Sequence, residues 1–353
     1  MSSLVLPHIR KLAAYVPGEQ PKIPGLIKLN TNENPYPPSP RVFRALKQAI
    51  DPRLRLYPDP ASLSLRKAIA AHFHCGTENV FVGNGSDEIL SLALRAFAGE
   101  KCRVIFPAPS YSLYPVLVQI QNARPLVVEL GADYTFSVEK FRPNASLSFI
   151  ANPNAPSGTF IHKRILARLA RRLKGVLLID EAYADFAREN CATLFKTFSN
   201  VLVTRSFSKS YSLAGMRVGF ALGSRALINA LFKVKDSYNV DRLAQIAAEA
   251  AFRDQPYLRR NVRRIRGTRE RLSKSLLAHD WEVLPSEANF VFARPPEGMR
   301  AIDVFRHFRC HKVLVRHFPG KRTGAWLRIS IGTDKEIDFL LKALQSICRP
   351  GKR

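Results

Sequence analysis

We expect an α/β fold, with a large domain built on a mostly parallel seven-stranded sheet flanked by helices and a smaller α+β domain at the C-terminal end. Short apolar runs alternate with helical patterns through the middle of the chain, and this pattern changes near residue 244. The chain has 353 residues, more than one hydrophobic core usually supports. Two domains that share an interface therefore fit the sequence better than one.

The parallel sheet is expected from a series of apolar runs. They are Val80–Gly83, Arg103–Pro107, Pro125–Glu129, Leu147–Ala151, Val176–Asp180, Val201–Arg205 and Val218–Leu222. Helical patterns lie among them, at Asp87–Ala98, Lys163–Leu173 and Arg225–Lys233. Such alternation is typical of a sheet covered by helices on both faces, and ligands bind at the carboxyl ends of its strands. We therefore expect functional residues in the loops that follow the strands.

The two ends of the chain differ from this middle region. Prolines recur through residues 1–40, which predicts an extended N-terminal arm that packs with the small domain and a partner subunit. Beyond residue 244, one or two long basic helices precede further strand and helix patterns. These are strands at Trp281–Leu284, Phe290–Ala293, Val313–Val315 and Leu327–Ile331, and a closing helix from Lys335. We place the large domain at residues 41–243 and the small domain at residues 244–353.

Composition indicates a globular protein without a membrane partner. Apolar residues make up 46% and charged residues 24% of the chain, and no apolar run approaches the roughly 18 residues of a membrane span. The start lacks the continuous apolar core of a signal peptide. The five cysteines are scattered and form no Cys-x-x-Cys motif, which is typical of free thiols in a reducing compartment. We expect a cytoplasmic protein.

The net charge of +27 leaves several interpretations open. The densest basic run lies between Tyr257 and Lys274, where no aromatic residues alternate with the arginines to stack on bases. Because no nucleic-acid-binding motif accompanies this run, we predict no nucleic-acid partner; charge alone favours only non-specific association. The alternatives are a solvated helix face and attraction of anionic, phosphorylated substrates.

A first candidate site follows the strand Val80–Gly83. The sequence Gly83-Asn84-Gly85-Ser86-Asp87-Glu88 opens a helix, where free backbone N–H groups near Gly85 can bind an anion. Ser86 adds a hydroxyl, and Asp87 can cap the helix. A dinucleotide-binding loop would need a third glycine where Glu88 stands, so that interpretation is weak. A plain capped loop remains the alternative.

A second candidate site is an acid at the end of the strand Val176–Asp180. In Ile179-Asp180-Glu181-Ala182-Tyr183, the two acids point to opposite faces if both stay extended. A metal ligand is the alternative function, but no cluster of histidine and cysteine has a strong metal spacing. His307, Cys310 and His311 are more typical of a surface helix than of a zinc site. We therefore predict no metal. The proline-rich loop Asn152–Gly158 predicts a rigid turn at another strand end.

A third candidate site is Ser206-Phe207-Ser208-Lys209, with Arg217 beyond it. The spacing of Ser206 and Lys209 also matches the acylating motif of β-lactamases, but the two other motifs of those enzymes are missing. A lysine at a strand end can bind phosphate or form a Schiff base. An anion-binding helix start, a strand-end acid and this lysine occur in the order that pyridoxal phosphate requires: a phosphate cradle, a partner for the ring nitrogen and an amine for the aldehyde.

The chain resembles the fold-type-I pyridoxal-phosphate aminotransferases, and within them the histidinol-phosphate aminotransferases. The resemblance runs nearly end to end. Besides the motifs above, it includes Leu29-Asn30-Thr31-Asn32-Glu33-Asn34-Pro35, Tyr57-Pro58-Asp59, Ser286-Glu287-Ala288-Asn289-Phe290 and Leu327-Arg328-Ile329-Ser330-Ile331-Gly332-Thr333. It implies a homodimer with pyridoxal 5′-phosphate as cofactor.

The resemblance also implies roles for single residues. Lys209 would bind the cofactor aldehyde and move the proton, Asp180 would pair with the ring nitrogen, and Tyr183 would bond the 3′ oxygen. The remaining cofactor contacts would be Gly85, Ser86, Asp87, Tyr111, Ser206, Ser208 and Arg217, with Tyr57 supplied by the other subunit. The substrate would meet Tyr15, Asn32, Asn289, Arg316 and Arg328, the last of which would bind the carboxylate of glutamate or the phosphate of the second substrate.

One position departs from the family. Where the family places asparagine before Pro-Ser-Gly, this chain has Ala155, and Asn154 stands next to it. We take Asn154 as a cofactor contact and predict that Asn154→Ala shifts the pH at which the cofactor band titrates. The resemblance implies transamination of L-histidinol phosphate with 2-oxoglutarate, giving imidazole-acetol phosphate and L-glutamate in histidine biosynthesis. An aromatic amino acid aminotransferase and an enzyme like threonine-phosphate decarboxylase are the alternatives.

Overall fold

A seven-stranded sheet forms the centre of the larger part of the molecule. The computed structural model describes residues 4–348. In spatial order the strands are β2 (Val80–Gly83), β8 (Gly219–Gly223), β7 (Val201–Ser206), β6 (Val176–Asp180), β5 (Leu147–Ala151), β3 (Arg103–Ala108) and β4 (Arg124–Glu129). From β7 to β4 all neighbours are parallel, and β8 alone runs antiparallel to both of its neighbours. The predicted mostly parallel sheet is confirmed.

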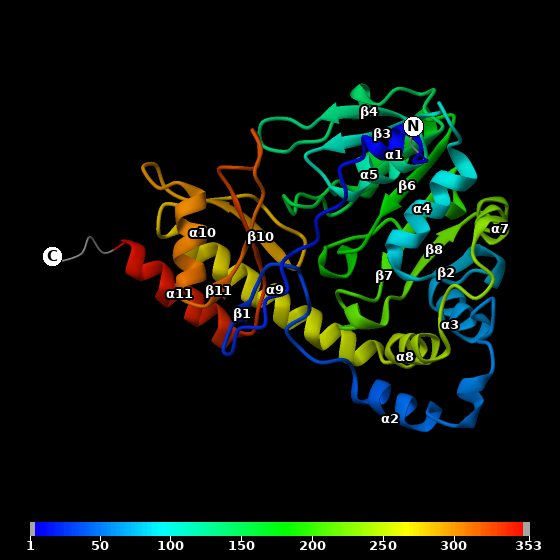
Figure 1. The fold of residues 1–353 in the computed structure, drawn as a ribbon, viewed down its shortest axis with the longest axis horizontal. Helices are drawn as coiled ribbons and strands as arrows, with labels where there is room; N and C mark the ends of the chain where they lie inside the picture. Colours follow the sequence, from blue (N-terminus) through cyan, green and yellow to red (C-terminus); the bar gives the residue numbers. More distant parts are fainter. Residues whose placement is uncertain (1–3, 349–353) are drawn as a thin grey trace.

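Helices cover both faces of this sheet, because its strands are apolar on both sides (Figure 1). One face packs against α4 (Gly85–Phe97), α5 (Leu113–Ile120) and α7 (Arg225–Val234). The other packs against α3 (Leu63–Phe73), α6 (Lys163–Arg172) and α8 (Arg242–Arg253). In β6, Leu178 joins the first core while Leu177 and Ile179 join the second. By the same alternation Asp180 lies on the side of Leu178.

A second, antiparallel sheet forms the smaller part of the molecule. Its order is β12 (Arg316–His317), β13 (Leu327–Ser330), β10 (Phe290–Arg294) and β9 (Glu282–Val283). The helices α9 (Gln255–Leu277), α10 (Ala301–Cys310) and α11 (Asp334–Cys348) share its core. The expected strand at Val313–Val315 exists as β11 (Val313–Leu314), but it pairs in parallel with β1 (Ile27–Lys28) of the arm. The arm therefore adds its own strand to this part of the fold.

The N-terminal arm joins the two parts. It begins with α1 (Pro7–Arg10) beside α5, crosses to the smaller part of the molecule, where β1 pairs with β11, and returns to α2 (Pro40–Ala49) beneath the large sheet (Figure 1). Short 3₁₀ helices complete the described chain: η1 (Pro52–Arg55), η2 (Thr77–Asn79), η3 (Val138–Lys140), η4 (Ala184–Phe186), η5 (Leu194–Lys196) and η6 (Ala214–Met216). None of the described helices combines the length and the apolar character needed to cross a bilayer.

The domain boundaries stay predictions, and the packing bears on the second of them. Helix α8, just after residue 243, contributes Ala244, Ala247 and Phe252 to the core of the large sheet. Along α9, Leu258 belongs to that same core, whereas Ile265 and Leu272 belong to the core of the small sheet. We propose that α9 is the connection between the domains and that the boundary lies within it.

Candidate active site

A cavity of about 560 Å³ lies at the carboxyl ends of the parallel strands. Asp180 and Ser206, the last residues of β6 and β7, are in its wall, and the arm and the small sheet complete it. Most of the predicted site residues line it. They are Tyr15, Asn32, Ser86, Asp87, Tyr111, Asp180, Tyr183, Ser206, Ser208, Lys209, Arg217, Arg316 and Arg328. Residues from across the whole chain therefore meet at one place.

Asp180 is a buried carboxylate at the base of the cavity. It accepts hydrogen bonds from the hydroxyl of Tyr114 at 3.1 Å, from the N–H of Ala182 at 3.2 Å and from Thr204 at 3.4 Å. Burial is the main cause that raises the pKa of Asp180 to about 6. Glu181 faces the other way and pairs with Arg205 at 3.1 Å, as the extended strand predicted. Only the first acid therefore serves the cavity.

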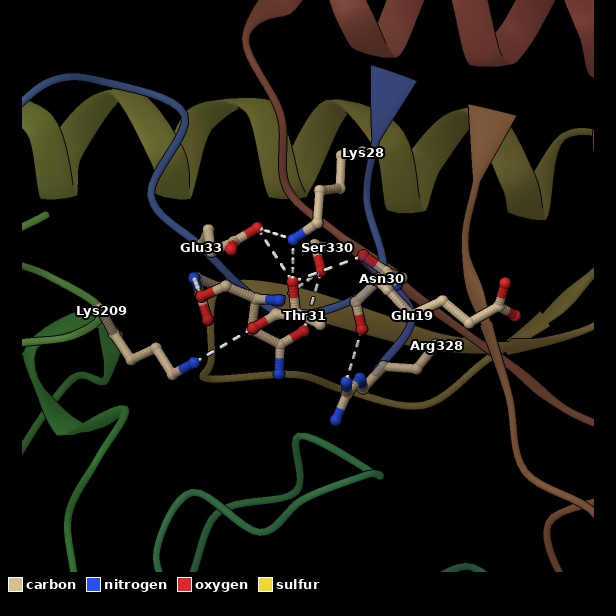
Figure 2. A network of polar contacts seen from close by, with 10 residues as sticks. Glu19, Lys28, Asn30, Thr31, Glu33, Lys209, Arg328 and Ser330 are labelled. Carbon is tan, nitrogen blue, oxygen red and sulfur yellow. Dashed lines mark hydrogen bonds and ion pairs between the residues drawn. The ribbon is translucent and has the colours of Figure 1, made fainter. Parts of the chain in front are cut away.

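Lys209 is partly buried beside the arm. Its Nζ donates a 3.1 Å hydrogen bond to the carbonyl of Thr31, as Figure 2 shows. Burial first, and then repulsion from Arg328, lower the pKa of Lys209 to about 8, although Glu33 acts in the opposite direction. The Asn34 amide donates to the carbonyl of Lys209 at 2.9 Å and to the next carbonyl at 3.1 Å. The arm therefore fixes both ends of this lysine.

The start of α4 and the loop after β7 form a polar corner. Arg217 contacts Asp87 at 3.1 Å and donates to Ser208 at 3.4 Å. Gly85 has a φ of 78°, and a Cβ atom there would lie 2.7 Å from a guanidinium nitrogen of Arg217. Glycine therefore lets the arginine approach the helix start. With Ser206 beside them, these groups offer hydroxyl, N–H and guanidinium donors to an anion.

Tyr183 is held by the arm. Its hydroxyl accepts a 3.0 Å hydrogen bond from the amide of Asn32. Asn32 has a φ of 55°, and it is fixed by Ser330 at 2.9 Å and by Asn289 at 3.0 Å. Asn289 is buried and does not line the cavity, so it orients Asn32. The structure therefore does not bring Asn289 to the cavity, where the substrate contact was predicted.

Two arginines, Arg316 and Arg328, face the cavity from the small sheet. Arg328 of β13 donates to the carbonyl of Asn30 at 2.8 Å, and its buried Nε has no hydrogen-bond partner among residues 4–348 (Figure 2). Arg316 of β12 donates to the carbonyls of Val16 and Pro17, each at 3.3 Å. Within the described chain neither forms an ion pair with an acid. This wall is therefore suited to binding an anion.

Two predicted cofactor side chains, those of Asn154 and Tyr57, do not line the cavity. The Asn154 side chain is bonded to Ser110 at 2.7 Å, to Ser157 at 2.9 Å and to the carbonyl of Pro109 at 3.1 Å, whereas Ala155 lines the wall. Tyr57 lies on the surface, 80% exposed, and stacks on Tyr238 with 4.4 Å between the ring centroids. The side-chain amide of Asn154 thus makes its hydrogen bonds in and beside its own loop, and the Tyr57 side chain is exposed on the surface of its own subunit.

The sequence analysis assigned no role to several residues that the structure brings to the site. Tyr114 donates to Asp180, Asn34 fixes the Lys209 backbone, and Glu33 lines the cavity and pairs with Lys28. The three-residue spacing of Tyr111 and Tyr114 at a helix start could have indicated a shared face. No pattern linked the arm residues to the lysine. Within residues 4–348, no group of three or more His, Cys, Asp or Glu side chains is placed to hold a metal ion.

The family model for aminotransferase class I and II matches residues 24–344. The chain belongs to this family. It is 44% identical to the histidinol-phosphate aminotransferase of Acetobacter pasteurianus, with 98% of each chain covered, and 46% identical to that of Geobacter sp. (strain M21), again with 98% of each covered. These relatives place it in the histidinol-phosphate branch, as its motifs predicted.

A solved structure agrees with this assignment. The histidinol-phosphate aminotransferase from Sinorhizobium meliloti, determined in complex with pyridoxal 5′-phosphate, superposes with a TM-score of 0.88 at 26% identity. The match covers 98% of this chain and 99% of that chain. The fold-type-I architecture predicted from the sequence is confirmed, and the chain is an aminotransferase.

Proposed function

We propose that the protein transfers an amino group between L-histidinol phosphate and 2-oxoglutarate with pyridoxal 5′-phosphate as cofactor, giving imidazole-acetol phosphate and L-glutamate in histidine biosynthesis. The observation that carries the proposal is the meeting of Lys209, Asp180 and two arginines in one cavity of a chain 44% identical to a histidinol-phosphate aminotransferase. Within residues 4–348 these arginines donate to backbone carbonyls and form no ion pair with an acid. This gives a cofactor wall and an anion-binding wall that face each other. A cytoplasmic location remains a prediction from the cysteine pattern.

The residues present fit pyridoxal phosphate. Asp180 is buried without a cationic partner among the described residues, and its raised pKa reflects that isolation. A protonated ring nitrogen would supply the missing positive charge and stabilise the carboxylate. The corner formed by Gly85, Ser208 and Arg217 offers donors for the phosphate, and Tyr111 lines the same cavity and donates to Asp87 at 3.0 Å. We propose these residues, with Ser86, Asp87 and Ser206, as the cofactor contacts.

Lys209 is proposed as the attachment point and as the proton carrier. When bound, the cofactor supplies an aldehyde that carries the amino group and a ring that delocalises the electron pair released at the substrate Cα. A pKa near 8 leaves part of the Lys209 amines uncharged near neutral pH, so Nζ can accept a proton. Tyr183, oriented by Asn32, would hold the cofactor's 3′ oxygen. Asp180 would keep the ring nitrogen protonated.

The small-sheet wall is proposed to recognise the substrate anions. Arg328 and Arg316 would bind the carboxylate of glutamate in one half-reaction and the phosphate of the second substrate in the other, since a guanidinium fork suits both anions. The ring of Tyr15 lies edge-on to that of Tyr111, with 6.2 Å between the ring centroids. Tyr15 would close over the bound substrate from the arm. Asn32 is proposed to reach the substrate from the same segment.

A homodimer is part of the proposal. Tyr57 is far too exposed for a residue that serves its own cavity. Other large apolar side chains in the same part of the sequence are exposed too: Phe43, Ile50, Leu54, Leu56 and Leu63. Covering them with a second copy would bury this apolar surface and could direct Tyr57 to the partner's phosphate site. Mixing Tyr57→Ala with Lys209→Ala subunits tests this, because only hybrid dimers would regain activity at one intact site. Absence of any regain would contradict the shared site.

The absorption spectrum tests the function directly. The protein with added pyridoxal phosphate should show a long-wavelength band that Lys209→Ala abolishes, and L-histidinol phosphate should convert the band to that of the amine form. A Lys209-dependent band that ignores L-histidinol phosphate would assign the substrate to an aromatic aminotransferase or to an enzyme like threonine-phosphate decarboxylase. Product analysis then distinguishes these two, because only the second releases carbon dioxide.

A further inference from the structure

One aromatic ring contacts both arginines of the substrate wall. The guanidinium carbon of Arg316 lies 5.3 Å from the ring centroid of Phe318, and that of Arg328 lies 5.1 Å from the same centroid. Both distances are within the range of cation–π attraction, about 6 Å. Phe318 itself lines the cavity. The ring is therefore shared by the two cations that face the substrate space.

Arg328 also lies 5.4 Å from the ring centroid of Phe290, but Phe318 is the ring that the two arginines share. Each donates to backbone carbonyls of the arm, and neither pairs with a carboxylate in the part of the chain that the structure describes. They also repel each other, since Arg316 is one of the causes that lower the pKa of Arg328, after burial. The electron-rich face of an aromatic ring attracts a guanidinium group without neutralising it. Phe318 can thus hold both cations close while leaving their donors free.

The position of the Phe318 ring is set from outside the cavity. The ring packs against a cluster formed by Leu130, Tyr134, Leu284, Phe292 and Trp326. The loop that carries it is fixed as well, because the guanidinium of Arg322 donates to the carbonyl of Leu130 at 2.7 Å and the hydroxyl of Tyr134 donates to the backbone carbonyl of Arg322 at 2.7 Å. Tight packing against this cluster fixes the position of the ring. The two arginines contact the ring as well.

We propose that Phe318 is a specificity-determining residue that positions Arg316 and Arg328 as a two-armed receptor for the phosphate dianion of the substrate. The inference rests on the proposed function. A phosphate has enough oxygens to accept from two guanidinium groups at once, whereas a carboxylate is satisfied by one fork. Loss of the ring would therefore weaken binding of the phosphorylated substrate more than binding of L-glutamate.

Leucine and tyrosine at this position form a matched pair of variants. Phe318→Leu keeps an apolar side chain but removes the ring, and Phe318→Tyr keeps the ring. We expect Phe318→Leu to raise KM for L-histidinol phosphate about tenfold, with kcat little changed and KM for L-glutamate changed less than about threefold. Phe318→Tyr should remain near the wild type. Equal increases for both substrates, or equal defects in both variants, would overturn the proposal.

Binding of inorganic phosphate separates this proposal from the proposed function. Calorimetry on the cofactor-loaded protein measures phosphate binding outside the cofactor's own phosphate site, and Phe318→Leu should weaken it about tenfold. If the wild type fails to react with L-histidinol phosphate, the proposed function is wrong. The phosphate measurement still tests whether Phe318 contributes to anion binding. Unchanged phosphate affinity in Phe318→Leu, with a melting temperature like that of the wild type, would refute the role of the ring.

Discussion

The cavity has two walls, and they differ in how their polar groups are satisfied. On the sheet wall, Asp180 has three hydrogen-bond donors and Arg217 has Asp87 as a partner. On the opposite wall, Arg328 and Arg316 donate to arm carbonyls, and the Nε of Arg328 has no partner within residues 4–348. A pre-ordered polar wall suits a resident cofactor, and a wall of unneutralised cations suits an exchanging anionic substrate.

The difference follows from how each wall is built. The sheet wall consists of loops after neighbouring parallel strands, whose positions are fixed by a large apolar core. The other wall consists of two short paired strands, β12 and β13, and an irregular segment of the arm to which their arginines are joined through backbone carbonyls (Figure 2). Substitutions on the sheet wall should therefore act on the chemical step and the cofactor, and those on the other wall on substrate affinity.

The largest effect is expected at Lys209. Lys209→Ala removes both the attachment point and the proton acceptor, so we expect kcat to fall by at least about 10³-fold. Steady-state transamination assays measure this fall. Lys342→Ala, on the exposed face of α11, is the control and should keep full activity. Substantial turnover by Lys209→Ala would contradict the assignment of the sheet wall to chemistry.

Asp180→Asn should separate catalysis from stability. We expect kcat to fall about 10²-fold, because the ring nitrogen loses its charged partner. The stability of the cofactor-free protein, by contrast, should rise in this variant. Since burial raises the pKa of Asp180 to about 6, its ionised form destabilises the cofactor-free fold above that pH, by about 3 kcal/mol.

The cofactor-free variant should therefore melt at a higher temperature than the wild type at pH 8. This advantage should shrink as the pH falls through 6, where the wild-type carboxyl becomes protonated. Thermal melts of both proteins between pH 5 and pH 8 measure it. A variant that is less stable than the wild type at pH 8 would show that the buried charge of Asp180 is not a cost to the fold.

Arg328→Gln tests the coupling between the walls. We expect KM for L-histidinol phosphate to rise about 10²-fold with a smaller change in kcat. Removing the arginine should also raise the pKa of Lys209, because Arg328 is the second cause that lowers it. In the wild type, pyridoxal phosphate should add faster as the pH rises through about 8, and in the variant this midpoint should lie higher.

Arg259→Gln, an exposed position on α9, is the control for a general loss of positive charge. It should leave KM and the midpoint in place. Equal shifts in both variants would mean that the basic surface as a whole, and not Arg328, sets the lysine pKa.

The smallest effect on the cofactor is expected at Asn154, where the structure reverses the sequence-based prediction. Because its side chain is bonded within the loop at Ser110 and Ser157, Asn154→Ala should leave the pH titration of the cofactor band unchanged. It should instead lower stability by about 1–3 kcal/mol, measured by denaturant unfolding. Asn32→Ala is the comparison and should shift the titration, because it removes the donor to Tyr183.

The sheet and its functional loops could be predicted from the sequence. Each strand of the large sheet is a short, largely apolar run. The chemistry lies at the end of β6 and in the loop after β7, so Asp180 and Lys209 follow from local pattern. Alternation along β6 also assigned Asp180 and Glu181 to opposite faces. These inferences succeed because the side-chain period of a strand is local and the carboxyl ends of parallel strands meet at one edge.

Only the tertiary structure decided which side chains of the arm and of the irregular loops reach the cavity. Nothing in the spacing of Thr31, Asn34 and Lys209 indicates that the arm holds the lysine, since these contacts join residues more than 170 positions apart. The sequence likewise could not show that Asn154 is bonded within its own loop while Ala155 lines the cavity. Side-chain direction in an irregular loop depends on its neighbours in space, and no periodicity in the sequence records them.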